Sequence, residues 1–142
     1  MRNARFAIPL VVALLAACGG GGGRLSHSEF VKRADALCKA AVAKVKAVPK
    51  PQSLAELPRY LERIRPIQRH FLAQARQLHA PVRDEPVWQR ALRFDERVLH
   101  QYDLMAAAAR RHDLRTVGRI SRGLAALPER NPYERRLGMK GC

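Results

Sequence analysis

The chain has 142 residues, and its 27 Lys and Arg against 12 Asp and Glu give a formal net charge of +15. This length allows one domain with a leader and leaves no room for a second full core. A hydrophobic content of 47% excludes wholesale disorder, and three cysteines are too few for a disulfide-dense mini-fold. Aromatic residues make up only 6%, and Val and Ile are sparse after the first fifteen residues, which argues against an all-β sandwich.

Residues 1–17 have the features of an export signal. Arg2 and Arg5 give a positive start, the apolar run of residues 6–17 follows, and small residues precede Cys18. This run is too short for a helix that crosses the hydrocarbon layer, which needs roughly 20 apolar residues. We therefore expect residues 1–17 to act as a signal peptide and not as a permanent transmembrane span.

The end of this leader, Leu15-Ala16-Ala17-Cys18, resembles the lipobox of bacterial lipoproteins. In that family the cysteine sulfur receives a diacylglycerol, signal peptidase II cuts just before it, and the new amino terminus is often acylated, for example with palmitate. The resemblance implies lipidation of Cys18 and a protein held at the cell membrane on its extracytoplasmic side. Residues 18–25, which include five glycines, then form a flexible tether. The alternative is an ordinary secretory leader cut after Ala17.

The other two cysteines favour a disulfide. With Cys18 lipidated, Cys38 and Cys142 form an even pair in an oxidising compartment. A bond between them closes a long loop and stabilises the fold by roughly 4–5 kcal/mol in the chain-entropy description. Two free or intermolecular thiols are the alternative. We predict a Cys38–Cys142 disulfide.

Apolar residues recur at every third or fourth position after the tether, a spacing typical of amphipathic helices. The pattern predicts a first helix within residues 26–48, because Pro49 and Pro51 cannot continue it. A second helix is predicted to begin with a capping box at Ser53. Pro66 lies inside this second helix and should bend or interrupt it.

Helix starts can also be predicted in the second half of the chain. Asp84 and Asp113 have the position of N-caps for a third and a fourth helix, and Pro128 should end the fourth. A short last helix is predicted between Asn131, as its cap, and Gly138, as a left-handed C-terminal residue.

Four helices joined by short connections favour antiparallel neighbours. We therefore predict that residues 26–142 are an all-α domain, an up-down-up-down antiparallel four-helix bundle closed by one disulfide. Segments 29–38 and 137–142, together with Asp113, also resemble small, uncharacterised, cysteine-paired helical lipoproteins of high-GC Gram-positive bacteria. That resemblance implies a helical fold with paired cysteines and no particular activity. Pro128 and Pro132 depart from its pattern of a continuous last helix.

No residue pattern points to catalysis. Glu96 and His100 have a spacing that can chelate a metal, but no second pair accompanies them. Asp95 falls near the apolar stripe of the third helix, where we expect it to meet an arginine, and no carboxylate partner stands out. The sequence contains no HExxH, GxSxG or phosphate-loop motif. We predict no enzyme activity, no catalytic residue, no metal and no cofactor.

Arginines spaced to share a helix face are the remaining signal. Six of them are candidates for contact with an anionic surface, namely Arg90, Arg93, Arg97, Arg115, Arg119 and Arg122. A solvated basic surface without a specific role is the alternative. Anionic lipids or wall polymers are the expected partners, and nucleic acid is not, because an exported, tethered protein rarely meets it.

The leading hypothesis is a membrane-anchored, non-enzymatic lipoprotein that acts as an envelope interaction or structural protein through its surface. The alternative is a binding module for a small ligand or an anionic envelope polymer. A ligand-sized apolar pocket between the helices would favour the module, and a tightly filled core would favour the surface role.

Overall fold

The computed structural model describes residues 23–128 and 131–141. Within these ranges the chain forms five helices and no strand, which confirms the all-α prediction. The helices are α1 (His27–Lys46), α2 (Leu57–Ala75), α3 (Glu85–Arg110), α4 (Leu114–Ala125) and α5 (Pro132–Arg136). The predicted signal peptide, the lipidation site Cys18 and the last cysteine, Cys142, lie outside the described residues. None of the helices in the described part has the length and hydrophobicity that a membrane-crossing segment needs.

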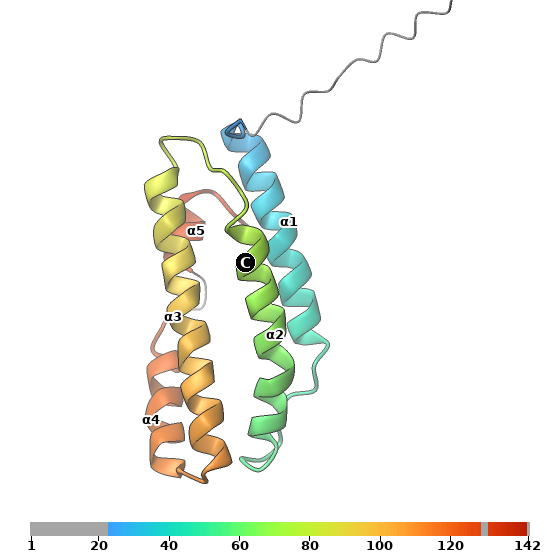
Figure 1. Cartoon of the computed structure of the whole chain (residues 1–142), viewed down its shortest axis with the longest axis vertical. Helices are drawn as coiled ribbons and strands as arrows, with labels where there is room; N and C mark the ends of the chain where they lie inside the picture. The colour runs from blue at the N-terminus through green and yellow to red at the C-terminus, as the bar shows by residue number, and fades with distance from the viewer. Residues whose placement is uncertain (1–22, 129–130, 142) are drawn as a thin grey trace, which may run out of the picture.

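The three longest helices, α1, α2 and α3, lie side by side, and each runs opposite to the one before it (Figure 1). α4 packs against the far half of α3, and α5 packs against the half of α3 nearer the tether. No Cα of α1 comes within 8 Å of a Cα of α4. A four-helix bundle closed by a disulfide therefore stays a prediction, since direct α1–α4 packing does not provide the closure.

Several helix ends follow the local signals in the sequence. The Ser26 hydroxyl accepts a hydrogen bond from the Glu29 amide at the start of α1, and the Asp113 carboxylate accepts one from the Thr116 amide at the start of α4. Asn131 caps α5, and Gly138 has a φ of 84° after it. Because an L side chain rarely adopts such a φ, glycine is the residue expected at this position.

Other helix ends differ from prediction. α2 begins at Leu57, not at Ser53, because residues 53–56 form a turn before the helix. The Glu56 carboxylate accepts a hydrogen bond from the Gln52 amide at this turn. α2 then continues through Pro66 without a break. At the start of α3, the Asp84 carboxylate does not cap the helix.

The Asp84 carboxylate is instead bonded to His27 at the start of α1. The Oδ2 atom of Asp84 lies 2.7 Å from Nδ1 of His27. This contact joins the beginning of α1 to the beginning of α3, at the end of the molecule where α1 starts.

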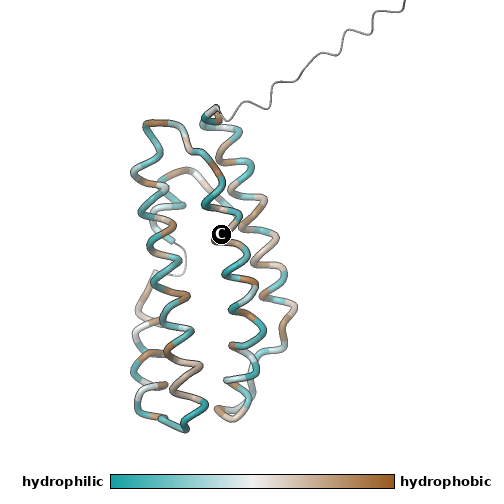
Figure 2. The backbone as a smooth tube through the Cα atoms, in the orientation of Figure 1, coloured by the Kyte–Doolittle hydropathy of each residue, from teal (hydrophilic) through white to brown (hydrophobic). Residues whose placement is uncertain are grey.

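The core is divided into two clusters along the length of the molecule. The cluster near the tether is centred on Phe30 and Trp88, whose rings meet edge to face at 5.1 Å, and it includes Leu137 and Met139 from the tail. The distant cluster brings together α2, α3 and α4, with Leu61, Ile64, Met105, Ala106, Ala108, Val117 and Ile120 buried. Along every helix, hydrophobic and hydrophilic residues alternate as amphipathic packing requires (Figure 2).

The helical chain after α3 is interrupted at the height between these two clusters. α4 ends at Ala125 and α5 begins at Pro132. Pro128 has no amide hydrogen to donate, and Pro132 is tolerated only in the first turn of a new helix. In the described part of the chain, α4 and α5 therefore leave the middle of α3 without a helix on their side.

Candidate functional site

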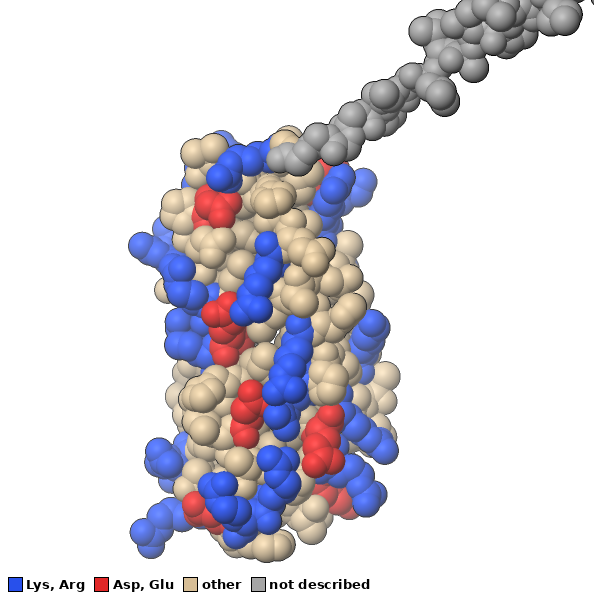
Figure 3. All heavy atoms as spheres, in the orientation of Figure 1, with Lys and Arg blue, Asp and Glu red and all other residues tan. Residues whose placement is uncertain are grey.

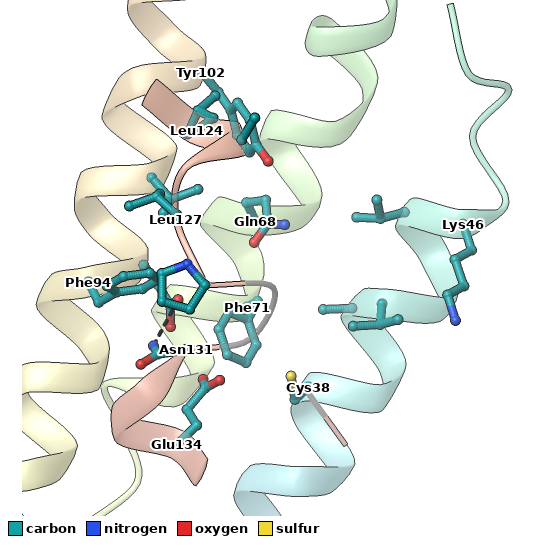
Figure 4. Close-up of a pocket in the computed structure, with 17 residues that line it drawn as sticks. Cys38, Lys46, Gln68, Phe71, Phe94, Tyr102, Leu124, Leu127, Asn131 and Glu134 are labelled. Carbon is teal, nitrogen blue, oxygen red and sulfur yellow. Dashed lines mark hydrogen bonds between the residues drawn. The ribbon is translucent and has the colours of Figure 1, made fainter. Parts of the chain in front are cut away.

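A cavity of about 570 Å³ lies at this interruption, between the two core clusters (Figure 4). Its size falls in the range of small-molecule sites, roughly 300–1,000 Å³. The walls come from α1 between Cys38 and Lys46, from Gln68 and Phe71 of α2, from α3 between Phe94 and Tyr102, from residues 124–128, and from Asn131 and Glu134. The cavity therefore meets the criterion that favours a binding module.

Most of the cavity wall is apolar. Four of its apolar lining residues come from four different helices: Val42 of α1, Phe71 of α2, Val98 of α3 and Leu124 of α4. Phe71 is buried, and the other three are partly exposed. Gln68 and Phe71 project into the space between α1 and α3 (Figure 4). An apolar body placed here would lose contact with water wherever these walls cover it, and burial of this kind is the main source of affinity in such sites.

Two carboxyl groups meet at one end of the cavity. Asp95 of α3 and Glu134 of α5 both line it, and the Glu134 carboxyl interacts directly with that of Asp95. Glu134 is buried, with 4% of its surface exposed. Among the described residues, the neighbours of the Asp95 carboxyl are Asn131 and a second carboxyl, so the arginine partner expected for it stays a prediction. Glu134 lies 39 residues after Asp95 in the chain, and no local sequence pattern predicts that the two residues pair.

Burial is the largest influence on the Asp95 carboxyl and raises its pKa to about 6. Hydrogen bonds with Asn131 and Glu134 act in the opposite direction, and the nearby charge of Glu96 adds to the increase. Two carboxyls in a place of low dielectric cannot both ionise freely. Asp95 therefore retains its proton well above the pH at which an exposed aspartate loses its own.

Asn131 holds this acidic end together. Its Nδ2 atom donates to the carbonyl of Ala91 and to Oδ1 of Asp95, each at 3.1 Å, while its Oδ1 accepts from the Tyr133 amide. The side chain is 6% exposed. The sequence predicts Asn131 only as a helix cap, and its attachment to α3 was missed because both partners lie far away in the chain.

Glu96 and His100, whose spacing can chelate a metal, do not come together with further ligands in the described part of the chain. Glu96 forms an ion pair with Arg76 at 2.7 Å, and His100 is exposed beside it in a shallow hollow between α2 and α3. Across the described ranges, no three His, Cys, Asp or Glu side chains are grouped as metal ligands.

The six predicted arginines are all exposed. Within residues 23–128 and 131–141, none of them takes part in an ion pair. The arginines between α2 and α3 differ, because Arg65 and Arg69 contact Asp103, and Arg76 contacts Glu96. On the face seen in Figure 3, acidic side chains lie beside basic ones. We call the unpaired set, Arg90, Arg93, Arg97, Arg115, Arg119 and Arg122, the arginine surface.

The tail returns to α1 beside Cys38. The amides of Lys140 and Gly141 donate to Oδ1 of Asp35 at 2.9 and 3.0 Å. A Cβ on residue 141 would stand 2.8 Å from both the Asp35 carbonyl oxygen and the Lys39 Cγ, so only glycine fits. Residue 141 therefore lies against the turn of α1 that carries Cys38, which is buried and is not a free thiol.

No protein-family model, curated protein or solved structure matches this chain.

Proposed function

We propose that this protein is a non-enzymatic, lipid-anchored extracytoplasmic binding module whose interhelical cavity holds a small ligand. The single observation that carries the proposal is the cavity of about 570 Å³ between the two core clusters. A bundle selected only for its outer surface would gain stability by filling this space, since buried apolar area contributes about 25 cal/mol per Å². The open middle is therefore better explained by a ligand.

The anchor is part of the same proposal. We propose that Cys18 is acylated and that residues 18–25 tether the domain to the outer surface of the cell membrane. Its support is the lipobox and the polyglycine segment in the sequence. The cavity begins at Cys38, about 11 residues into α1, or roughly 16 Å along the helix axis from its start. The opening would thus stand clear of the lipid headgroups.

We also propose that a Cys38–Cys142 disulfide closes the bundle, with α4 and α5 sharing its fourth position. Support comes from the tail, whose residue 141 lies against Asp35 and Lys39, one turn from Cys38. Leu137 and Met139 pack into the same core cluster as Cys38. Peptide mapping of the exported chain without reductant tests this: a linked 38–142 pair is expected, and two free thiols would contradict it.

The binding proposal is tested with a neutral apolar dye, N-phenyl-1-naphthylamine, whose fluorescence rises on transfer from water to an apolar site. The mature chain with Cys18→Ser retains every described residue and avoids detergent. We expect saturable binding of one dye per chain. Ala41→Trp, which fills the cavity, should abolish it, whereas Ala43→Trp, at an exposed position of the same helix, should not. Equal binding by both variants would refute a cavity site.

A second candidate function is favoured by the arginine surface. Six exposed arginines without ion-pair partners in the described part lie on α3 and α4, three on each helix. Basic residues near an anionic leaflet contribute about 1 kcal/mol each. We propose that this surface holds the anchored domain against anionic lipids, and that wall polymers are the competing partner to be distinguished by experiment.

A further inference from the structure

We propose that the end of the molecule opposite the start of α1 carries a docking surface for an acidic segment of another protein. One bulky apolar side chain of that segment enters a hollow of about 180 Å³, which is lined by residues of segments 54–58 and 109–117. We call it the distal hollow. All of its lining residues are described, and the inference is independent of the cavity between the two core clusters.

The distal hollow lies where two helices pack on α3 without meeting each other. α2 and α4 both pack against α3, but no Cα of α2 comes within 8 Å of a Cα of α4. At the lower end of Figure 1, the beginnings of α2 and α4 stand on either side of the end of α3. The buried Val117 and the half-buried Ala109 belong to the lining. The hollow is therefore a gap with apolar walls between packed helices.

Two exposed leucines border the distal hollow. Leu54, in the turn before α2, is 57% exposed, and Leu114, the first residue of α4, is 58% exposed. Neither leucine belongs to a core cluster, so folding does not account for a large apolar side chain at these positions. Exposed apolar residues scattered singly are ordinary, whereas apolar residues gathered around one hollow favour an interaction site.

The volume of the distal hollow fits one side chain and is too small for an ordinary ligand site. Small-molecule sites hold roughly 300–1,000 Å³, whereas a cavity of about 150 Å³ is enough for a benzene ring. Two turns fix the shape of the hollow: the Glu56 amide donates to the Ser53 carbonyl at 3.2 Å, and the Asp113 amide donates to the Ala108 carbonyl at 3.0 Å. A surface that is already formed costs less order when its partner binds.

The charges at this end of the molecule favour an acidic partner. Residues 50–63 and 108–115 contain six Lys and Arg against three Asp and Glu. The three acids already have hydrogen-bond or ion-pair partners; they are Glu56, Glu62 and Asp113. Arg59 and Arg111, each next to a lining residue in the chain, are exposed and form no ion pair with a described residue. An acidic segment complements this charge, whereas a second copy of the chain would bring like charges together.

The position of the distal hollow favours a protein partner over the anchoring bilayer. α3 has 26 residues, so its end lies roughly 39 Å from its beginning, which is joined to the start of α1 through His27 and Asp84. The proposed tether enters at the start of α1, at the other end of the molecule. A flat lipid surface also supplies no side chain that would fill a hollow.

The probe is a synthetic ten-residue peptide of Glu, Asp and Ser with one central Phe, titrated into the methyl-labelled mature chain with Cys18→Ser. We expect saturable shifts of the methyl resonances of Leu57, Leu114 and Val117, which line the distal hollow. Replacing the Phe by Ser should weaken binding about tenfold, equivalent to about 1.4 kcal/mol. Replacing the acids by Gln and Asn should weaken it about fivefold. Absence of saturable shifts, or equal binding of all three peptides, would overturn the proposal.

A double variant tests the apolar part of the docking surface. Leu54→Ser with Leu114→Ser should bind the Phe peptide about tenfold more weakly. The matched control is Val82→Ser with Leu104→Ser, because both residues are exposed and neither lines the distal hollow. Unchanged affinity in the first double variant, or an equal loss in both, would overturn the assignment to the distal hollow.

A second pair of variants tests the charge. Arg59→Gln with Arg111→Gln should weaken peptide binding about fivefold. Lys32→Gln with Lys44→Gln removes the same charge from exposed positions of α1 and should leave binding unchanged. An equal effect of the two pairs would show that net charge alone attracts the peptide, and would overturn the role of the arginines beside the distal hollow.

Sedimentation with vesicles of phosphatidylcholine and phosphatidylglycerol tests the competing occupant, an anionic lipid surface. Leu54→Ser with Leu114→Ser should sediment as the wild-type protein does. Loss of vesicle binding in this double variant, together with unchanged peptide binding, would assign the distal hollow to lipid and overturn the proposal.

Discussion

The side chains of Asn131 and Asp95 are joined by a hydrogen bond of 3.1 Å from the amide nitrogen to the carboxylate oxygen Oδ1. The same amide donates to the carbonyl of Ala91, so Asn131 fastens α5 to α3 at two points. α5 has five residues, too few for a stable helix by itself. Asn131 therefore helps to hold α5, and with it Glu134, against α3 at the acidic end of the cavity.

Asn131→Ala should destabilise the fold by about 1–3 kcal/mol. The variant removes a helix cap and leaves the Ala91 carbonyl and the Asp95 carboxyl without their buried donor. Denaturant unfolding measures the change. Gln89→Ala is the control, since Gln89 is an exposed amide on α3 and should cost less than about 0.5 kcal/mol. A loss no larger than the control's would show that α5 does not depend on this contact.

The free energy of unfolding should contain a contribution from Asp95 that falls as the pH rises from about 4 to about 6. In the unfolded chain the carboxyl has its ordinary pKa of 3.8, and in the folded protein burial raises the pKa to about 6. The folded state thus binds the proton more tightly in this interval, and stability declines as the proton is lost. The full difference is of the order of 2–3 kcal/mol.

The measurement is the difference between the stability profiles of the wild-type protein and Asp95→Asn. Taking the difference removes the contributions of other carboxyls, such as Glu29 and Asp113, whose pKa values are lowered by hydrogen bonds with Arg33 and Thr116. Those groups contribute stability that is lost toward acid, the opposite trend. A difference that stays constant from pH 4 to pH 6 would contradict the buried state of Asp95.

Gly141→Val should detach the tail from α1. The new Cβ would stand 2.8 Å from the backbone carbonyl of Asp35, which cannot move away as a flexible side chain does. Overpacking of this kind costs typically 1–3 kcal/mol, and reduction of the proposed disulfide by dithiothreitol should become faster. Gly123→Ala is the control, because a Cβ there meets nothing within 4 Å and alanine favours the helix. A Gly141→Val protein as stable and as slowly reduced as wild type would disprove the tail contact.

Replacing Arg115, Arg119 and Arg122 by Gln should weaken sedimentation with anionic vesicles. Each arginine near a negative leaflet contributes about 1 kcal/mol, and the binding should weaken as salt is raised. The matched control replaces Arg69, Arg76 and Arg110 by Gln. These substitutions remove the same total charge, but each of these arginines is paired with an acidic residue. An equal loss in both triple variants would mean that net charge alone matters. Retained vesicle binding with lost binding to acidic wall polymer would assign the surface to the polymer.

The sequence predicts the helices well where their signals are local. Ser26, Asp113, Asn131 and Gly138 act as caps because the groups that they satisfy lie within a few residues. Asp84 did not follow the same rule, because His27 competes for its carboxylate from 57 residues away.

The candidate site is harder to predict, because the residues that form it lie far apart in the sequence. Pro128 and Pro132 predict a break in the last helix. They do not predict which parts of α1 and α2 lie uncovered beside that break. The Asp95–Glu134 pair joins α3 to α5, and its members share no sequence spacing that indicates contact. Tertiary packing decides both features, so they appear only when the helices are assembled.

The most direct test of the cavity function is to observe where the neutral dye sits. Methyl-labelled protein saturated with N-phenyl-1-naphthylamine should show intermolecular nuclear Overhauser effects from the dye to the methyl groups of Val42, Val45 and Val98, which line the cavity. Effects confined to Leu54, Val82 and Leu114, which are the most exposed large hydrophobic residues in the described part, would show surface adsorption and contradict the account.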